Sequence, residues 1–108
     1  MSREVGNRAE QIASEWLMKQ GCQILDRNVY SRFGEIDIIA LRDGILHFIE
    51  VKSGITFEPI YNITPTKIAK LLRSIQAYLK KYKLDMPYQI DALIVKGDEC
   101  EWIENITI

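Results

Sequence analysis

Residues 35–52 read EIDIIALRDGILHFIEVK, two apolar runs joined by Asp43 and Gly44. Asp-Gly between two β-rich runs is typical of a two-residue hairpin, because both turn residues must adopt positive φ. The sequence therefore predicts an antiparallel hairpin in the middle of the chain. Alternation of side chains makes both of its faces apolar, with Ile36, Ile38, Ile49 and Val51 on one face and Ile39, Leu41, Leu46 and Phe48 on the other.

The length of the turn also predicts the register of the hairpin. Counting outward from the turn, we expect the pairs Arg42–Ile45, Leu41–Leu46 and Ile39–Phe48. At the open end of the hairpin, the same count places Asp37 opposite Glu50 and Glu35 opposite Lys52. A bulge in either strand would shift these pairs by one residue.

The other elements follow from hydrophobic periodicity and turn residues. We expect a helix over 7–20 capped by Asn7, a strand over 22–29, a connection over 30–34, a loop over 53–64, a helix opened by Thr64-Pro65, and strands over 88–96 and 101–108 around a turn at 97–99. A hairpin that is apolar on both faces needs a cover on each side. The sequence therefore predicts an α/β fold with a central mixed sheet of about five strands flanked by helices.

The predicted second helix is amphipathic and strongly basic. Its apolar stripe contains Ile68, Leu71, Leu72, Ile75, Leu79 and Tyr82, and its opposite face contains Lys67, Lys70, Ser74, Ala77 and Lys81. Six basic residues and no acidic residue lie between Lys67 and Lys83. We expect Lys67 and Lys70 to contact nucleic-acid phosphates, with a merely solvated helix face as the alternative. In the preceding loop, the expected roles of Phe57, Ile60 and Tyr61 are stacking on bases or covering a neighbouring subunit.

Length and composition indicate one soluble domain over residues 1–108. Apolar residues make up 47% of the chain and charged residues 27%, which is enough to build a core. The net charge of −1 gives no bulk attraction to a polyanion, so nucleic-acid binding would depend on where the charges lie. No stretch predicts a membrane span, and Cys22 and Cys100 lack the spacing of a zinc site. We therefore expect a cytoplasmic protein with free thiols.

Charged side chains gather at the open end of the predicted hairpin. Facing carboxylates destabilise a sheet, and their apolar neighbours also desolvate them. A hard divalent cation such as Mg²⁺ would compensate these charges with carboxylate, water and phosphate oxygens around it. The alternative is an ion-pair network, in which Glu35 pairs with Lys52, Asp37 binds backbone amides, and Glu50 meets Arg32 or Arg42.

The order Asp37, turn, Glu50-Val51-Lys52 resembles the active-site motif of the PD-(D/E)XK metal-dependent nucleases. A wider set of residues resembles the bacterial YraN family, densely over the first half of the chain: Gly6, Glu10, Ala13, Leu17, Gly21, Asn28, Gly34-Glu35-Ile36-Asp37, Ile39-Ala40 and Phe48-Ile49-Glu50-Val51-Lys52. The resemblance implies a restriction-endonuclease-like fold. It also implies that Asp37, Glu50 and Glu10 are metal ligands and that Asp37, Glu50 and Lys52 form the catalytic set.

The function that this resemblance implies is metal-dependent hydrolysis of phosphodiester bonds in nucleic acid, branched or single-stranded DNA among them, with Mg²⁺ or Mn²⁺. The cation would polarise a phosphoryl oxygen and activate a water, and Lys52 would orient that water or stabilise the transition state. Glu35 would hold Lys52 in place or join a second metal site. The alternatives are a non-catalytic nucleic-acid-binding or assembly module and a protein-interaction subunit. A homodimer is compatible with so small a chain holding a duplex junction.

Overall fold

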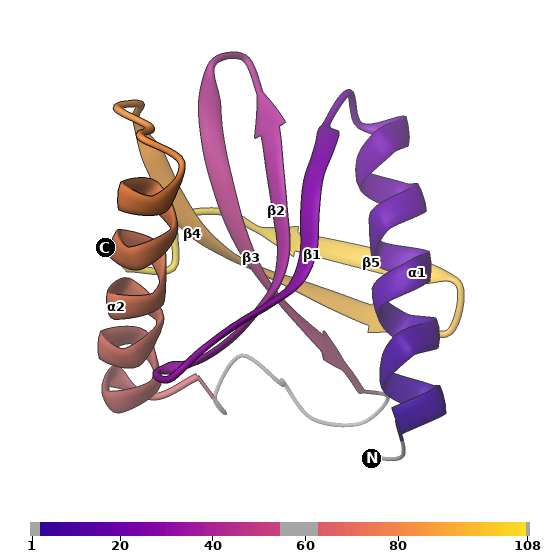
Figure 1. Cartoon of the computed structure of the whole chain (residues 1–108). Helices are drawn as coiled ribbons and strands as arrows, with labels where there is room; N and C mark the ends of the chain where they lie inside the picture. Colours follow the sequence, from indigo (N-terminus) through magenta and orange to yellow (C-terminus); the bar gives the residue numbers. More distant parts are fainter. Residues whose placement is uncertain (1–2, 55–62, 108) are drawn as a thin grey trace.

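The computed structural model describes residues 3–54 and 63–107 (Figure 1). Phe57, Ile60 and Tyr61, with most of the expected loop, lie outside these residues. The elements in chain order are α1 (Arg3–Lys19), β1 (Gln23–Ser31), β2 (Gly34–Arg42), β3 (Ile45–Ser53), α2 (Pro65–Lys81), β4 (Tyr88–Lys96) and β5 (Glu99–Ile103). No helix among the described residues is long and apolar enough to cross a membrane.

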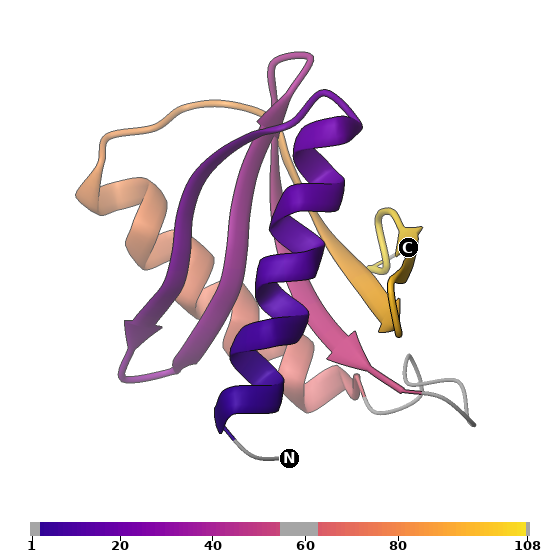
Figure 2. The same cartoon turned by 90° about the vertical axis from the view of Figure 1, so that its right-hand side faces the viewer.

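The five strands form one mixed sheet in the order β1-β2-β3-β4-β5. Neighbouring strands are antiparallel except β3 and β4, which run parallel and are connected through α2. The two helices cover opposite faces of the sheet, as Figures 1 and 2 show from two directions. The prediction of an α/β fold with a flanked, mixed sheet is confirmed, and the arrangement is consistent with a restriction-endonuclease-like fold.

Each face of the sheet has its own hydrophobic core. The core under α1 includes Ala13, Leu17, Ile38, Ala40, Ile49 and Leu93, and the core under α2 includes Ile36, Ile39, Leu46, Phe48, Ile75 and Ile90. Ile36 therefore packs on the α2 side of the sheet, although strict alternation predicts that it shares a face with Ile38. The change of side coincides with Asn28 on the neighbouring strand, which adopts a left-handed φ of 52° between the pairs Arg27–Ile38 and Val29–Ile36.

Several predicted boundaries were wrong. The helix α1 begins at Arg3 instead of at Asn7, and β1 runs on to Ser31, so that only two residues connect it to β2. The last strand begins at Glu99, which pairs with Lys96, and it ends at Ile103. It ends there because the chain turns back toward β4, where the Ile106 N–H donates to the Ile90 carbonyl at 2.8 Å.

The helix α2 starts as predicted. Its N-cap is Thr64, whose hydroxyl accepts from the Lys67 N–H, and Pro65 opens the first turn. Its buried stripe differs from the prediction at four positions, since Leu72 and Tyr82 are exposed, whereas Ser74 and Tyr78 are buried. Ser74 is buried because the β1–β2 hairpin leans on the helix, with the Ser31 and Ser74 hydroxyls 2.9 Å apart.

Candidate metal-binding site

The site lies where β2 and β3 separate. The predicted pairs Arg42–Ile45, Leu41–Leu46 and Ile39–Phe48 are confirmed, and the paired part of the two strands runs as far as Ile38–Ile49. Asp37 and Glu50 come next along the two strands, just beyond the last pair, so the predicted pairs Asp37–Glu50 and Glu35–Lys52 are not part of the β2–β3 ladder. Here a carboxylate oxygen of Asp37 accepts the backbone N–H of Val51 at 2.8 Å. The Asp37 side chain thus bridges β2 and β3 where their backbone pairing has ended. This bond agrees with the alternative of an ion-pair network, in which Asp37 binds backbone amides.

Glu10, Glu35 and Asp37 bring carboxylate oxygens together from α1 and β2. One oxygen from each of the three side chains lies within 4.8 Å of the other two. Glu10 is only 8% exposed, since α1 packs on the sheet at this point. The structure therefore joins the helix residue Glu10 to the strand residues, as the resemblance implied, and places Glu35 in the same group.

Asn28 is the residue of this site that sequence reasoning did not assign. With its amide nitrogen turned toward the carboxylates, the side chain donates to Glu10 Oε1 at 2.6 Å and to Glu35 Oε1 at 2.6 Å. Asn28 has the left-handed φ of 52°, a conformation that asparagine adopts more readily than most residues. Asn28 is among the residues that resemble the YraN family, but its position between Glu10 and Glu35 depends on the pairing of β1 with β2. It holds two carboxylates of the group side by side.

Glu50 and Lys52 complete the site from β3. Lys52 Nζ lies 3.5 Å from Glu50 Oε1, and both side chains are mostly buried. The structural alternative paired Glu35 with Lys52, whereas the ion pair found joins Lys52 to Glu50. Lys52 thus lies at the candidate site as the ion-pair partner of Glu50. The ion pair uses Oε1 of Glu50, and the other carboxylate oxygen of Glu50 does not take part in it.

The pKa values of three carboxyl groups at the site are raised, in each case mainly by burial. Burial, and next the charge of Glu50, raise the pKa of Asp37 to about 8, although the bond from Val51 opposes this shift. Burial also raises the pKa of Glu50, with Lys52 opposing it. The pKa of Glu10 is raised by burial and by Glu35, with Arg27 opposing. Each of these groups would ionise more easily beside a cation.

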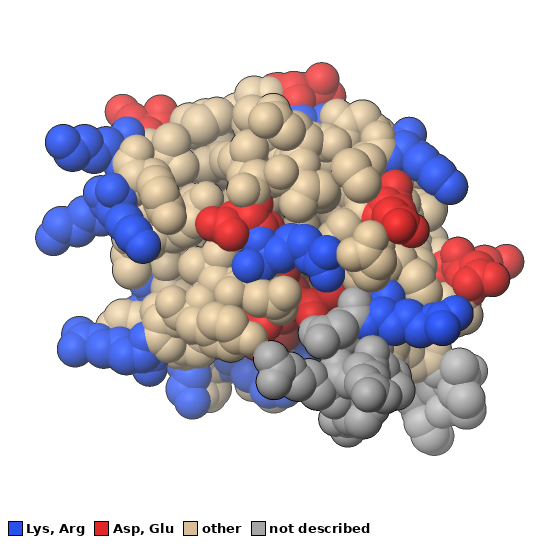
Figure 3. Space-filling model, turned by 45° about the vertical axis from the view of Figure 1, so that its right-hand side comes forward, with Lys and Arg blue, Asp and Glu red and all other residues tan. Residues whose placement is uncertain are grey.

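The donor set fits a hard divalent cation. It consists of carboxylate oxygens alone, which suit Mg²⁺ and Mn²⁺, and an exposed side leaves room for water or phosphate. Figure 3 shows acidic side chains in the middle of one face of the molecule with a basic side chain lying across them, and several basic side chains along the edge that carries α2. Acidic and basic groups therefore meet in the middle of this face, whereas the edge with α2 is basic.

Lys67 and Lys70 lie next to this site. Together with Glu35 and Glu50 they line a pocket between the β1–β2 hairpin and the first half of α2. Lys67 is close enough to Glu50 to lower the pKa of that carboxyl group. The structure thus places the two predicted phosphate-binding lysines in a pocket that Glu50, one of the predicted metal ligands, also lines.

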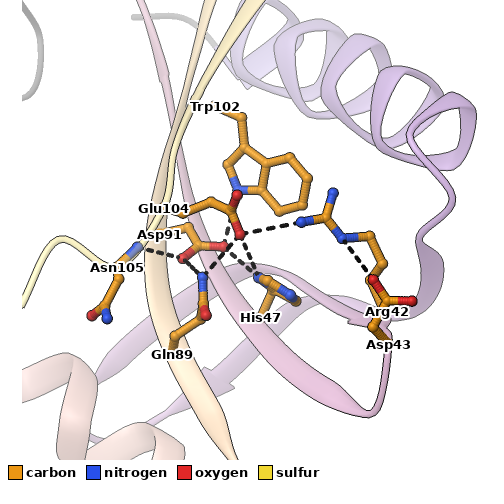
Figure 4. A network of polar contacts seen from close by, with 8 residues as sticks. All are labelled: Arg42, Asp43, His47, Gln89, Asp91, Trp102, Glu104 and Asn105. Atoms are coloured by element: carbon orange, nitrogen blue, oxygen red, sulfur yellow. Dashed lines mark hydrogen bonds and ion pairs between the residues drawn. The ribbon is translucent and has the colours of Figure 1, made fainter.

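A second cluster of titratable groups, His47, Asp91 and Glu104, lies on β3, β4 and the C-terminal segment (Figure 4). Asp91 is fully buried and accepts hydrogen bonds from His47 Nδ1 at 2.7 Å, Gln89 at 2.8 Å, and Trp102 and the Asn105 N–H at 2.9 Å. Burial alone would raise the pKa of Asp91, but these four donors hold it below its usual value.

Four donors engage the lone pairs of the Asp91 carboxylate, and Arg42 lies 3.3 Å from Glu104. The oxygens that a cation would need already have partners, so this network is structural. His47 is packed inside this network, and the Trp102 ring lies against it with the ring centroids 5.2 Å apart. Cys22 and Cys100 are free thiols, as expected.

Comparison with known proteins identifies the family of the chain. The model of the uncharacterised protein family UPF0102 matches residues 9–95. A UPF0102 protein of Wolinella succinogenes is 56% identical over 108 residues, which cover 100% of both chains. One from Helicobacter hepaticus is 57% identical over 99% of this chain and 97% of its own, and one from Helicobacter pylori strain HPAG1 is 51% identical over 97% and 92%. A carboxylate site at the open end of a nuclease-like sheet thus belongs to a chain that is a member of the UPF0102 family, also known as the YraN family.

Proposed function

We propose that this protein is a metal-dependent nuclease that hydrolyses phosphodiester bonds in nucleic acid, with branched or single-stranded DNA as its substrate class. The observation that carries the proposal is the juxtaposition of three buried or half-buried carboxylates, Glu10, Glu35 and Asp37, with the Glu50–Lys52 pair. A bound Mg²⁺ or Mn²⁺ supplies a Lewis acid for a phosphoryl oxygen and lowers the pKa of a water molecule. The site residues would hold that cation and position the substrate around it.

The roles proposed for the ligands follow from their surroundings. Asp37 is fixed by its bond from the Val51 N–H, which leaves its other oxygen for the cation. Glu10 offers an oxygen from α1, and Glu50 offers the oxygen that does not face Lys52. Asn28 holds Glu35 beside Glu10, so Glu35 is a candidate ligand as well as a supporting residue. The set has enough oxygens for one cation that keeps part of its water shell.

Lys52 is proposed as the catalytic lysine. Its ammonium group sits 3.5 Å from Glu50, at the edge of the carboxylate group. From there it can donate a hydrogen bond to the attacking water or to a phosphoryl oxygen whose negative charge grows in the transition state. The complete set of Asp37, Glu50 and Lys52 favours hydrolysis over the non-catalytic binding module, because a binder gains nothing from carboxylates that face a polyanion.

The test combines metal binding with cleavage. Mg²⁺ and Mn²⁺ are titrated calorimetrically into the wild type, Asp37→Asn and Asp43→Asn, and each protein is incubated with flapped, branched and single-stranded DNA. Asp43→Asn is the matched control, since it removes the same charge from the exposed hairpin turn, where the side chain is 90% exposed. We expect the wild type and the control to bind the metal and cleave, and Asp37→Asn to do neither. Cleavage that persists in Asp37→Asn, or in EDTA, would contradict the proposal.

Two further properties are proposed. The free thiols Cys22 and Cys100 are typical of a reducing compartment, so we infer a cytoplasmic location. A homodimer would give the protein two such sites for the two related strands of a junction. Sedimentation with and without a DNA junction tests the second point.

A further inference from the structure

A pocket adjoins the carboxylate site. Its cavity volume is about 140 Å³, and it lies between the tip of the β1–β2 hairpin, the end of β3 and the first half of α2. Its apolar walls come from four residues on three segments, namely Phe33, Ile63, Ile68 and Leu71. Glu35 and Glu50, which belong to the proposed metal site, also line it. A ligand in this pocket would therefore touch the cation at one end and apolar surface at the other.

Hydrogen bonds hold the hairpin tip against α2. The Phe33 N–H donates to the Ser31 hydroxyl at 3.1 Å, and that hydroxyl lies 2.9 Å from the hydroxyl of Ser74 on the helix. The guanidinium groups of Arg32 and Arg73 lie 4.8 Å and 5.7 Å from the centre of the Phe33 ring. The aromatic wall is thus fixed in position before any ligand arrives.

The charges of the pocket suit an anion that carries an apolar ring. Lys67 and Lys70 line its helix side, and the first turn of α2 contains no acidic residue. When a divalent cation neutralises part of the charge of Glu35 and Glu50, the surroundings become net attractive for phosphate. A ring of modest size fits the volume, which is well below the roughly 300–1,000 Å³ of pockets for drug-sized ligands.

We propose that this pocket receives the base of an unpaired nucleotide whose phosphate lies at the carboxylate site. The inference rests on the proposed nuclease function and narrows its substrate to nucleic acid with an unpaired nucleotide at the cleavage point. A base inside a duplex is stacked on both faces, so it can enter a concave pocket only after it leaves the stack. Unpaired tails and flaps avoid that cost. Phe33 is then a specificity residue, because its side chain forms the aromatic wall against which the base would lie.

The experiment measures binding apart from cleavage. Fluorescence anisotropy is recorded with Ca²⁺, which binds to the same kind of oxygen ligands, for a blunt duplex, the same duplex with a single-stranded tail, and the same tail made of abasic nucleotides. The abasic tail keeps the phosphates and removes only the bases. We expect the wild type to bind the tail with bases more tightly than the abasic tail by roughly 5- to 150-fold, the range of a stacked base.

Three variants locate the effect. Phe33→Ala removes the aromatic wall of the pocket, whereas Ile63→Trp keeps the aromatic wall and fills the pocket with a larger side chain. Because the two changes differ in kind, a folding defect in one variant leaves the other to decide the test. Both should lose the difference between the tail with bases and the abasic tail. Tyr82→Ala is the control, because it removes an exposed aromatic side chain from α2 that does not line the pocket. It should keep the difference.

Equal affinity of the wild type for all three DNAs would overturn the inference, as would an equal loss in Phe33→Ala and Tyr82→Ala. It would also be overturned if Phe33→Ala changed the sedimentation of the protein but not its DNA binding, since the pocket would then hold a second copy of the chain. The proposed function fails separately. Rapid Mg²⁺-dependent cleavage of blunt duplex contradicts the pocket but supports the nuclease, whereas base-dependent tail binding without any cleavage supports the pocket and contradicts the nuclease.

Discussion

Asp37→Asn should stabilise the metal-free protein while it abolishes hydrolysis. The pKa of Asp37 is about 8 in the folded protein against an ordinary 3.8, so at neutral pH the folded state must hold a proton that the unfolded chain has released. At pH 7 that difference amounts to roughly three pKa units, or about 4 kcal/mol at 1.36 kcal/mol per unit. Asp37 is only partly buried, and solvent screening reduces this to about 2 kcal/mol. Asparagine needs no proton and still accepts the Val51 N–H.

The pH dependence of this gain has a definite sign. Below about pH 4 both states of the wild type hold the proton, and the substitution gains nothing from this source. The gain grows as the pH rises from about 4 to about 8 and is constant above that, because the folded state then loses its proton as well. The wild type therefore loses stability relative to the variant over this interval.

Thermal and urea unfolding of the metal-free proteins, measured from pH 4 to 9, is the appropriate assay. A gain of about 2 kcal/mol at pH 7 corresponds to a rise in Tm of about 8 °C for a domain of this size. Asp43→Asn, with its exposed side chain, should follow the wild type at every pH. The reasoning is refuted if Asp37→Asn is less stable than the wild type at pH 7, or if its gain does not change with pH.

Added metal should reverse the order of stability. A cation at a concentration of 100 times its dissociation constant stabilises the folded state by about 2.7 kcal/mol. Only the wild type would receive this contribution, since Asp37→Asn lacks the ligand. Mg²⁺ or Mn²⁺ should therefore raise the Tm of the wild type above that of the variant. An equal rise in both proteins would show that the cation binds elsewhere.

Three other substitutions test separate parts of the structure. Asn28→Ala should destabilise the protein by about 1–2 kcal/mol in urea unfolding and weaken metal binding, because Glu10 and Glu35 lose the amide that donates to both. Asn28→Gly removes the same amide but readily adopts the left-handed φ, so a comparison of the two variants separates the loss of the amide from backbone strain. The double variant Lys67→Ala/Lys70→Ala should lower the slope of log affinity for single-stranded DNA against log salt by about 1.4, whereas Lys96→Ala should leave it unchanged. Asp91→Ala should cost about 3–5 kcal/mol, since four donors lose their acceptor. In the wild type, the stability from Asp91 should be complete above its ordinary pKa of 3.8 and disappear as the pH falls through its lowered value.

Local signals in the sequence were sufficient for the centre of the fold. The pair Asp43-Gly44 specifies its own turn, and the register of β2 and β3 follows by counting, so the site could be located at the end of that hairpin. Thr64 and Pro65 likewise mark the start of α2 within one turn of chain. In these cases the residues that determine the structure are neighbours in sequence.

The errors arose where residues distant in sequence decide the structure. Ser74 is buried because the β1–β2 hairpin, some forty residues earlier in the chain, packs against α2. The helical periodicity of α2 alone cannot predict this contact. Ile36 changes the side on which it packs opposite Asn28 of the neighbouring strand, and the amide of Asn28 reaches Glu10 on α1 as well as Glu35 on β2. Asp91 accepts hydrogen bonds from β3, β4, β5 and the segment after β5. The bond from the Asn105 N–H to Asp91 and the bond from the Ile106 N–H to the Ile90 carbonyl hold that segment against β4, so β5 ends earlier than its own residues indicate.

The attachment of α1 has a consequence for local unfolding. This helix forms no part of the sheet's backbone ladder and is held by apolar packing and a few side-chain bonds, such as Arg27 Nη1 to Gln11 Oε1 at 2.8 Å. Yet it supplies Glu10, so a cation shared with β2 would act as a cross-link between helix and sheet. Detachment of α1 would then require release of the ion, and amide hydrogen exchange in this one helix should slow selectively when metal is added. The rate at which α1 opens would therefore show whether the site holds a cation.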